Sequence, residues 1–319
     1  MKMRTIQAYI IDLALRTARV ARELLIIMLP VMLLVKLLEE WGFTESFSDF
    51  LAPAMALVGL PSEASIVVSI AMLTNLYAGI GATIVVMESL SMSVAEVSIL
   101  GSMMLFCHAL PVEQAVVKRA GASFFVTSGL RIFAAFSYGA LCHYFFSTFD
   151  LLQDPANSVL VLEGSGDGGW GDWFVSILMT IAVTCGIILA LLVLLDGLKK
   201  IGVIDWLVGK LAPVLTRLGM NAELTPLTII GLLLGLSYGG GMIIVEAKSK
   251  NYSAKDLFGV LLCLSLVHSL IEDTLLVLAL GSSVWIVLVW RLLFAMCLLV
   301  LSIKIYELLM TSKERDSGA

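Results

Sequence analysis

Charged side chains are scarce in this chain. Only 14% of its 319 residues are Asp, Glu, Lys or Arg, whereas about a quarter of residues are charged in a soluble domain. Hydrophobic residues make up 60%, which is more apolar surface than a water-soluble fold could bury, but a bilayer removes that need. Strict alternation of apolar and polar residues does not recur, which argues against a β-barrel. These shortages predict an all-α membrane protein.

Catalytic and nucleic-acid-binding signatures are also missing. The sequence has no H-E-x-x-H, G-x-S-x-G or paired-aspartate motif, so we expect neither enzyme activity nor a cofactor. The net charge is −5 and no basic cluster is interleaved with aromatic residues, so we expect no nucleic acid partner. The five cysteines stand singly in apolar runs without C-x-x-C spacing, which is typical of small core residues.

Lysine and arginine are absent from two long stretches, 37–117 and 132–198. Because these residues favour cytoplasmic loops, such stretches indicate segments that reach the outer face of the membrane. Basic residues gather instead near both ends of the chain, at Lys118 and Arg119, and in the stretch from Lys199 to Lys255. We therefore expect a multi-pass protein of a bacterial or archaeal inner membrane, with both termini in the cytoplasm.

The sequence contains an internal repeat with an offset of 160 residues. Leu-Ala-Pro at 51–53 matches Leu-Ala-Pro at 211–213, and His108 aligns with His268 although the chain has only three histidines. The same register pairs Arg131 with Arg291, Glu113 with Asp273, Gly79 with Gly239 and Gly81 with Gly241. Matches of rare residue types at one offset are typical of repeat architectures. The charge pattern starts the first unit inside and the second outside, so the two units are predicted to be inverted.

The predicted architecture is an amphipathic surface helix, six crossings and two hairpins that enter from opposite faces. The crossings are expected at about 24–41, 97–117, 120–146, 173–198, 257–280 and 283–308. Two short interfacial helices are expected at 46–58 and 205–218. The divisions are a surface helix at 1–23, the first repeat at 24–147, an acidic outer loop at 148–172, the second repeat at 173–310 and a cytoplasmic tail at 311–319.

Two hydrophobic segments have the flanks of re-entrant hairpins. Segment 64–87 has acidic residues at both ends, and its equivalent 224–247 has basic residues at both ends. Each has a glycine-rich middle that suits a tight turn, at 75–81 and 235–241. Irregular backbone at membrane depth is tolerated where protein or a water-filled cavity surrounds it. The alternative is a pair of ordinary spanning helices whose glycines pack against their neighbours.

The repeat resembles the Gate, or nucleoside-recognition, family over roughly residues 24–308. The resemblance rests on the repeat pattern and on two H-[AS]-L-x-x-[ED] elements, His108-Ala-Leu-Pro-Val-Glu113 and His268-Ser-Leu-Ile-Glu-Asp273. The family includes concentrative nucleoside transporters, the membrane core of the bacterial ferrous-iron transporter B and the spore-maturation proteins. The resemblance implies a solute carrier that works by alternating access, with hairpin tips and broken helices meeting at the membrane centre.

Five acidic or histidine residues fall inside the predicted crossings at 97–117 and 257–280, where a charge costs several kcal/mol unless it is paired or hydrated. They are His108, Glu113, His268, Glu272 and Asp273. On an unbroken helix His268 and Glu272 share a face, because they are four residues apart. Pro111 is expected to break the first helix and release carbonyl groups that can bind a ligand.

We interpret these residues as lining a central site, where they act as a proton relay, as cation ligands or as hydrogen-bond partners of a substrate. If a metal binds, the candidate ligands are His108, His268, Glu113 and Asp273. The alternative is a buried polar network that holds the two units together. For Arg131 and Arg291 we favour structural ion pairing with the acids over binding of an anionic group.

The hairpin tips are further candidates for substrate binding through backbone amides and half-helix ends. Their residues are Asn75, Tyr77, Gly79, Gly81, Ser237, Tyr238, Gly239 and Gly241. The alternative for these glycines is close packing of the turn. His143 has no partner in the repeat and is interpreted as a membrane-boundary residue.

Together these patterns predict a secondary active transporter, coupled to H⁺ or Na⁺, for a small polar solute or a metal ion. Its expected partners are the lipid bilayer, the transported substrate and a second copy of the chain in a homodimer. The alternative is a non-transporting membrane assembly protein of the spore-maturation type.

Overall fold

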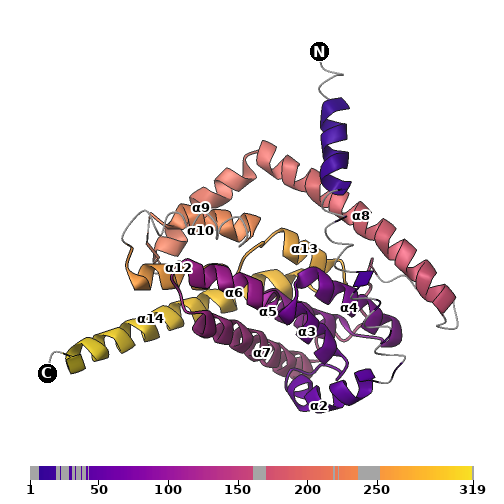
Figure 1. Ribbon diagram of the computed structural model, residues 1–319, viewed down its shortest axis with the longest axis horizontal. Helices are drawn as coiled ribbons and strands as arrows, with labels where there is room; N and C mark the ends of the chain where they lie inside the picture. Colours follow the sequence, from indigo (N-terminus) through magenta and orange to yellow (C-terminus); the bar gives the residue numbers. More distant parts are fainter. Residues whose placement is uncertain are drawn as a thin grey trace.

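The computed structural model describes most of the chain as helices joined by short connections (Figure 1). The described residues are 7–18, 43–160, 170–217, 223–235 and 252–317, with single positions between 22 and 41 and at 220 and 221. Within these ranges the extended pairing is confined to one isolated bridge between Ser93 and Pro155. The predicted all-α class is therefore confirmed for the described part of the chain.

The helices of the first half are α2 (Phe43–Leu57), α3 (Ala64–Leu73), α4 (Leu76–Ser89), α5 (Val94–Cys107), α6 (Leu110–Arg119) and α7 (Phe124–Phe149). Those of the second half are α8 (Trp170–Lys200), α9 (Val203–Arg217), α10 (Thr225–Leu234), α12 (Ala254–Leu266) and α13 (Glu272–Leu278), followed by a π-helical turn, η1 (Trp285–Trp290), and α14 (Arg291–Ser317).

Three described helical stretches are long and apolar enough to cross a membrane. They are Val94–Arg119, Phe124–Phe149 and Trp285–Leu309, close to three of the predicted crossings. Helix α8 covers a fourth predicted crossing, at 173–198. The predicted crossing at 257–280 is divided between α12 and α13, and most of the one at 24–41 lies outside the described residues.

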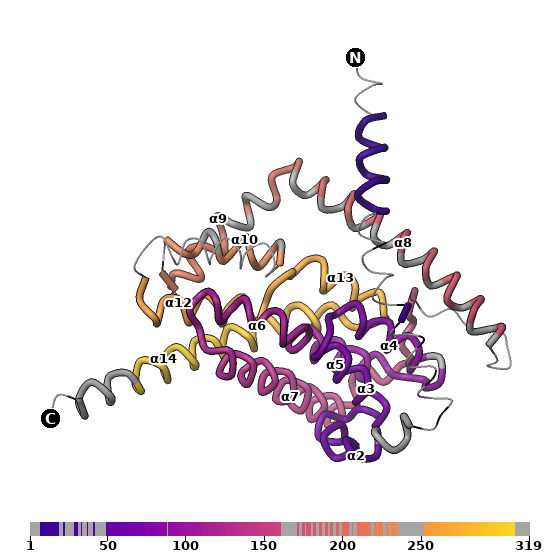
Figure 2. The backbone as a smooth tube through the Cα atoms, viewed as in Figure 1, coloured from indigo at the N-terminus to yellow at the C-terminus, as the bar shows by residue number. Residues whose placement is uncertain are grey.

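The stretch formed by α5 and α6 is more buried than the other long apolar helices. The most apolar window of Val94–Arg119 is 83% buried, whereas that of Phe124–Phe149 is 33% buried. Helices α5 and α7 lie side by side, and α14 runs beside α7 (Figure 2). The outer face of α7 carries exposed aromatic residues such as Phe125 and Phe133, as expected where the solvent is lipid.

Several features of the second half begin 160 residues after those of the first. Helices α2 and α9 each contain 15 residues and start at Phe43 and Val203. Ser93 caps α5 and Ser253 caps α12, each accepting a hydrogen bond from the backbone three residues on, as N-cap serines do.

The N-terminal helical segment at 7–18 contacts α8 through a partly buried ion pair and through a hydrogen bond from the hydroxyl of Tyr9 to Asp196. The Nη1 and Nη2 atoms of Arg16 donate to the two carboxylate oxygens of Asp196 at 3.1 and 2.6 Å. A bidentate contact of this kind fixes the orientation of the guanidinium as well as its position. Beyond this contact with α8, the segment projects from the body of the molecule (Figure 1).

Candidate functional site

The chain is interrupted in both halves at the predicted H-[AS]-L-x-x-[ED] elements. Between α5 and α6, Ala109 has a φ of 51°, and between α12 and α13, Ser269 has a φ of 46°. Left-handed backbone at a residue other than glycine is uncommon and ends a helix. The first interruption precedes Pro111, which lies in the first turn of α6, where a missing N–H group costs little.

Each interruption is held by the first helix of the neighbouring hairpin segment. The amide of Ala109 donates to the carbonyl of Ala71 in α3 at 2.9 Å, and the amide of Leu270 donates to the carbonyl of Leu232 in α10 at 2.8 Å. These bonds satisfy backbone groups that would otherwise be buried without a partner. Both breaks are thus built into the packing of the helices around them.

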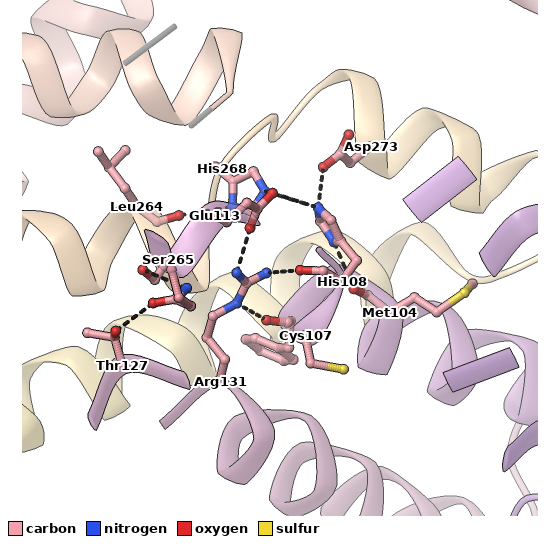
Figure 3. Close-up of polar contacts among 12 residues, drawn as sticks. Met104, Cys107, His108, Glu113, Thr127, Arg131, Leu264, Ser265, His268 and Asp273 are labelled. Carbon is pink, nitrogen blue, oxygen red and sulfur yellow. Dashed lines mark hydrogen bonds and ion pairs between the residues drawn. The ribbon is translucent and has the colours of Figure 1, made fainter. Parts of the chain in front are cut away.

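The imidazole rings of His108 and His268 meet at these two breaks (Figure 3). Both residues are buried, with 5% and 4% of their surface exposed. Their Nδ1 atoms lie 2.9 Å from the carbonyl oxygen of Met104 and 3.0 Å from that of Leu264. Their Nε2 atoms face each other at 3.1 Å. The rings aligned by the repeat are therefore direct neighbours in space.

Two carboxylates complete this cluster. Oε1 of Glu113 lies 3.0 Å from Nε2 of His268 and 3.4 Å from Nε2 of His108. Oδ2 of Asp273 lies 3.7 Å from Nε2 of His108. We call these four residues, His108, Glu113, His268 and Asp273, the central cluster. One donor atom from each of His108, His268 and Asp273 lies within 4.8 Å of the others.

Arg131 on α7 binds the end of α5 from behind the cluster. Its side chain is fully buried, and its Nη1 donates to Oε2 of Glu113 at 2.5 Å. Its Nε and Nη2 donate to the carbonyl oxygens of Phe106 and His108 at 2.6 and 2.9 Å. We expected the helix break to free carbonyl groups for a ligand. These two carbonyls instead accept from Arg131, because a guanidinium is the strongest nearby donor.

Arg291 on α14 does not repeat this arrangement. Its Nε donates to the carbonyl of Val287 at 2.7 Å, and its guanidinium carbon lies 5.8 Å from the centre of the Phe106 ring. Its Nη2 atom is buried without a hydrogen-bond partner. Among the described residues no carboxylate approaches it within ion-pair distance, Asp273 included. The two aligned arginines therefore occupy different environments.

Glu272 binds Tyr77 of the first half. The hydroxyl of Tyr77 on α4 donates to Oε1 of Glu272 at 2.6 Å. The expectation that His268 and Glu272 share a helix face is wrong, because the chain is not helical between Leu266 and Glu272. A spacing of four residues brings side chains together only on a continuous helix.

The first hairpin tip lies at the start of the stretch expected at 75–81 and includes Asn75, but not the glycines. Helix α3 ends at Leu73, and the turn occupies Thr74 and Asn75. Asn75 caps α4 by accepting from the amide of Ala78 at 2.9 Å. Gly79 and Gly81 are inside α4. The candidates Ser237, Tyr238, Gly239 and Gly241 lie outside the described residues.

Gly79 permits a close helix contact rather than a turn. A Cβ atom at this position would stand 2.7 Å from Cβ of Ala71 and 2.9 Å from Sδ of Met104. Both distances are shorter than van der Waals contact, so a side chain would push α4 away from α3 and α5. At this position the close-packing interpretation of the glycines applies.

A second polar chain lies beside the cluster and was not singled out from the sequence. Thr127 donates to Oε1 of Gln114 at 2.5 Å, and Nε2 of Gln114 donates to Ser265 at 3.4 Å. All three side chains are fully buried. The sequence feature that could have revealed them is Gln114, an amide side chain next to Glu113 inside a predicted crossing. They tie α6, α7 and α12 together, because buried polar atoms require partners.

His143 is not part of the central cluster and lines a separate cavity of about 310 Å³. The cavity is lined by His143, Glu96 and Asp150 among others, at the N-terminal end of α5. No residue of the central cluster lines it. His143 also fills the space beside Gly59, whose φ is +66°.

Apolar crossing helices around a buried set of ionisable side chains define a helical membrane protein. Residues 21–124 match the family model Gate, described as nucleoside recognition, in agreement with the resemblance predicted for this part of the chain. The chain is 28% identical over 270 residues to the uncharacterized membrane protein YvoD of Bacillus subtilis (strain 168), covering 83% of this chain and 84% of that protein. No solved structure matches the chain.

Proposed function

We propose that the protein is a secondary active transporter that moves a small polar solute or a metal ion by alternating access. The observation that carries this proposal is the 3.1 Å contact between the Nε2 atoms of His108 and His268 at two helix breaks. Ionisable side chains at membrane depth are costly, and substrate pathways are the usual reason for their presence. Interrupted helices meeting at such a point are the common architecture of transporter binding sites.

The paired elements of the two halves support an inverted repeat. Ala109 and Ser269 have matching positive φ angles, and so do Gly121 and Gly281, at 112° and 93°. Each of these pairs is 160 residues apart, as are the two histidines. Two similar units in opposite orientation can exchange conformations, which opens a site between them alternately to either side.

The different environments of Arg131 and Arg291 support the existence of two conformations. Arg131 is paired with Glu113, while Arg291 keeps a buried donor free and Asp273 faces His108 instead. A repeat of two like units has a second arrangement of similar energy, in which Arg291 takes Asp273 and Arg131 releases Glu113. A transport cycle needs two such states of comparable stability.

Coupling to H⁺ or to another cation fits the same cluster. Imidazole groups exchange protons in the physiological range, and imidazole and carboxylate groups both bind cations. The two processes compete for the same lone pairs, because a protonated group cannot be a ligand. A gradient of one ion can therefore drive movement of the other through the cluster.

Flux through proteoliposomes tests the proposal. The parent protein, His268→Ala and the control His143→Ala are reconstituted in equal amounts, and uptake of metal ions, nucleosides and amino acids is measured under an imposed proton or sodium gradient. We expect uptake of one solute class by the parent and the control, and background uptake by His268→Ala. Absence of uptake in the parent, together with co-purification of a defined protein, would favour the assembly role instead.

A further inference from the structure

We propose that the central cluster binds one divalent first-row transition metal ion and that this ion is the transported substrate. The identification as substrate rests on the proposed transport function. The metal site itself rests on the geometry of His108, His268, Asp273 and Glu113.

The hydrogen bonds of the two rings determine where their lone pairs point. A carbonyl oxygen only accepts, so the Nδ1 atoms of His108 and His268 donate to Met104 and Leu264. In a neutral ring the Nε2 atom then carries a lone pair and no proton. The 3.1 Å contact between the two Nε2 atoms is therefore a contact between two acceptors.

The carboxylates add further acceptors at the same point. Oε1 of Glu113 lies 3.0 and 3.4 Å from the two Nε2 atoms, and Oδ2 of Asp273 lies 3.7 Å from that of His108. Acceptors in contact repel one another unless a positive species lies between them. A proton bridges only two of these atoms, whereas a metal ion can be shared by all four.

The spacing fits first-row metal coordination. Two nitrogen ligands bound to a tetrahedral zinc ion at about 2.0–2.1 Å lie about 3.3 Å apart, and a carboxylate oxygen takes a similar place. In the central cluster the separations from the Nε2 atoms run from 3.0 to 3.7 Å. The two imidazoles and Glu113 therefore already lie near the spacing of three ligands, whereas Asp273, 3.7 Å from His108, would approach the ion to become the fourth.

The surroundings of the donors also suit a metal. Ligating histidines generally donate their second ring N–H to a carbonyl or carboxylate, as both rings do here. Glu113 is held in turn by Arg131. Only one of the carboxylates, Glu113, is paired with an arginine, so Asp273 is left to attract a cation.

The donor types select the class of ion. Imidazole nitrogen favours zinc, iron, cobalt and nickel, and the added carboxylates exclude none of these. Mg²⁺ and Ca²⁺ prefer sites made of oxygen alone. We therefore expect Zn²⁺ and Co²⁺ to bind in the presence of a large excess of Mg²⁺.

Metal titration of the purified full chain tests the inference. The protein is prepared with an affinity tag that lacks histidine and cysteine, stripped with a chelator, and titrated with Zn²⁺ and Co²⁺ while heat and visible absorption are recorded. The variants are His108→Ala, His268→Ala and Asp273→Asn. The last one changes the side-chain shape least, so it can still be measured if an alanine variant fails to fold. His143→Ala is the matched control, because it removes the third histidine of the chain, outside the cluster.

We expect one ion per parent chain, a cobalt spectrum typical of four nitrogen and oxygen ligands, and binding weakened more than about 100-fold in both cluster histidine variants. Unchanged binding is expected for His143→Ala. A parent that binds no ion, or variants that bind as well as the parent, overturns the metal site and leaves a shared proton between the rings. Binding without metal uptake in proteoliposomes upholds the site and overturns the proposed transport, while uptake of another solute without metal binding does the reverse.

Discussion

The hydroxyl of Tyr77 donates to Oε1 of Glu272 at 2.6 Å across 195 residues of sequence. Tyr77 stands on α4, in the first turn after the tip of the first hairpin, and Glu272 is the first residue of α13 in the other half. The bond therefore joins one hairpin to the broken helix of the opposite half, one residue from the central cluster. It is a direct polar contact between the two halves of the chain.

Tyr77→Phe removes this bond and leaves a partly buried carboxylate with one partner fewer. A hydrogen bond to a charged group contributes about 1.5–3 kcal/mol, so we expect a free energy of unfolding lower by that amount. Thermal unfolding of the purified protein measures the change. Tyr144→Phe is the control, because Tyr144 is 64% exposed on α7 and should lose almost nothing. Equal melting temperatures for the two variants would contradict the contact.

Gly79→Ala should destabilise the protein, because the added Cβ atom would stand 2.7 Å from Cβ of Ala71. Overpacking of this kind costs about 1–3 kcal/mol. Gly129 on α7 is the matched control, since a Cβ atom there meets nothing within 4 Å. Gly129→Ala should be neutral or stabilise by up to about 1 kcal/mol, because alanine is the better helix former. If the two variants unfold at the same temperature, α3 and α4 do not pack as described.

Arg131→Ala should be far more damaging than Arg291→Ala. Removal of Arg131 leaves Glu113 and the carbonyls of Phe106 and His108 without their donor, and breaking a buried ion pair costs about 3–5 kcal/mol. Arg291 has a buried Nη2 atom without a partner, so its removal gives up less. Thermal unfolding of both variants measures the difference.

A second substitution separates the ion pair from the rest of the Arg131 contacts. Arg131→Ala combined with Glu113→Gln should recover part of the lost stability, because no unpaired charge remains buried. A double variant that is no more stable than Arg131→Ala alone would assign the damage to the two carbonyls. Insertion into the membrane is checked for each variant by its yield in the membrane fraction.

The inverted arrangement predicts opposite accessibility for equivalent positions. Single cysteines at Leu90 and Lys250, 160 residues apart, should react with a membrane-impermeant maleimide from opposite sides. Labelling of intact cells and of inverted vesicles gives the two measurements. The background is a variant in which Cys185 and Cys297, which are not buried, are replaced by alanine; Cys107, Cys142 and Cys263 are buried and are kept. Reaction of both positions from one side would rule out the inverted repeat.

Parts of the fold could be predicted closely because they depend on local pattern. The interfacial helices expected at 46–58 and 205–218 correspond to α2 and α9, with starts that differ by two or three residues. The offset that aligned His108 with His268 is also the offset between the two rings that meet in space. A period in the sequence is sufficient for such inferences, since related units fold alike.

Other parts could not be predicted, because they depend on partners distant in sequence. The glycines at 79 and 81 suggested a turn, yet the turn is at Thr74 and Asn75, where the amide side chain of Asn75 starts a new helix. His268 and Glu272 do not share a helix face, because α12 ends before Val267. Neither outcome is encoded in residue spacing alone.

The sequence by itself determined that this is a helical membrane protein, that it contains matched rare residues in two halves, and that those residues include its buried histidines and acids. Only the tertiary structure decided which donor meets which acceptor. Arg131 donates to the carbonyls at the break, Tyr77 donates to Glu272, and the two imidazoles face each other. The physical reason is that hydrophobicity and charge act on each residue where it stands in the chain, whereas hydrogen bonds of buried groups depend on directions fixed only after the helices have packed.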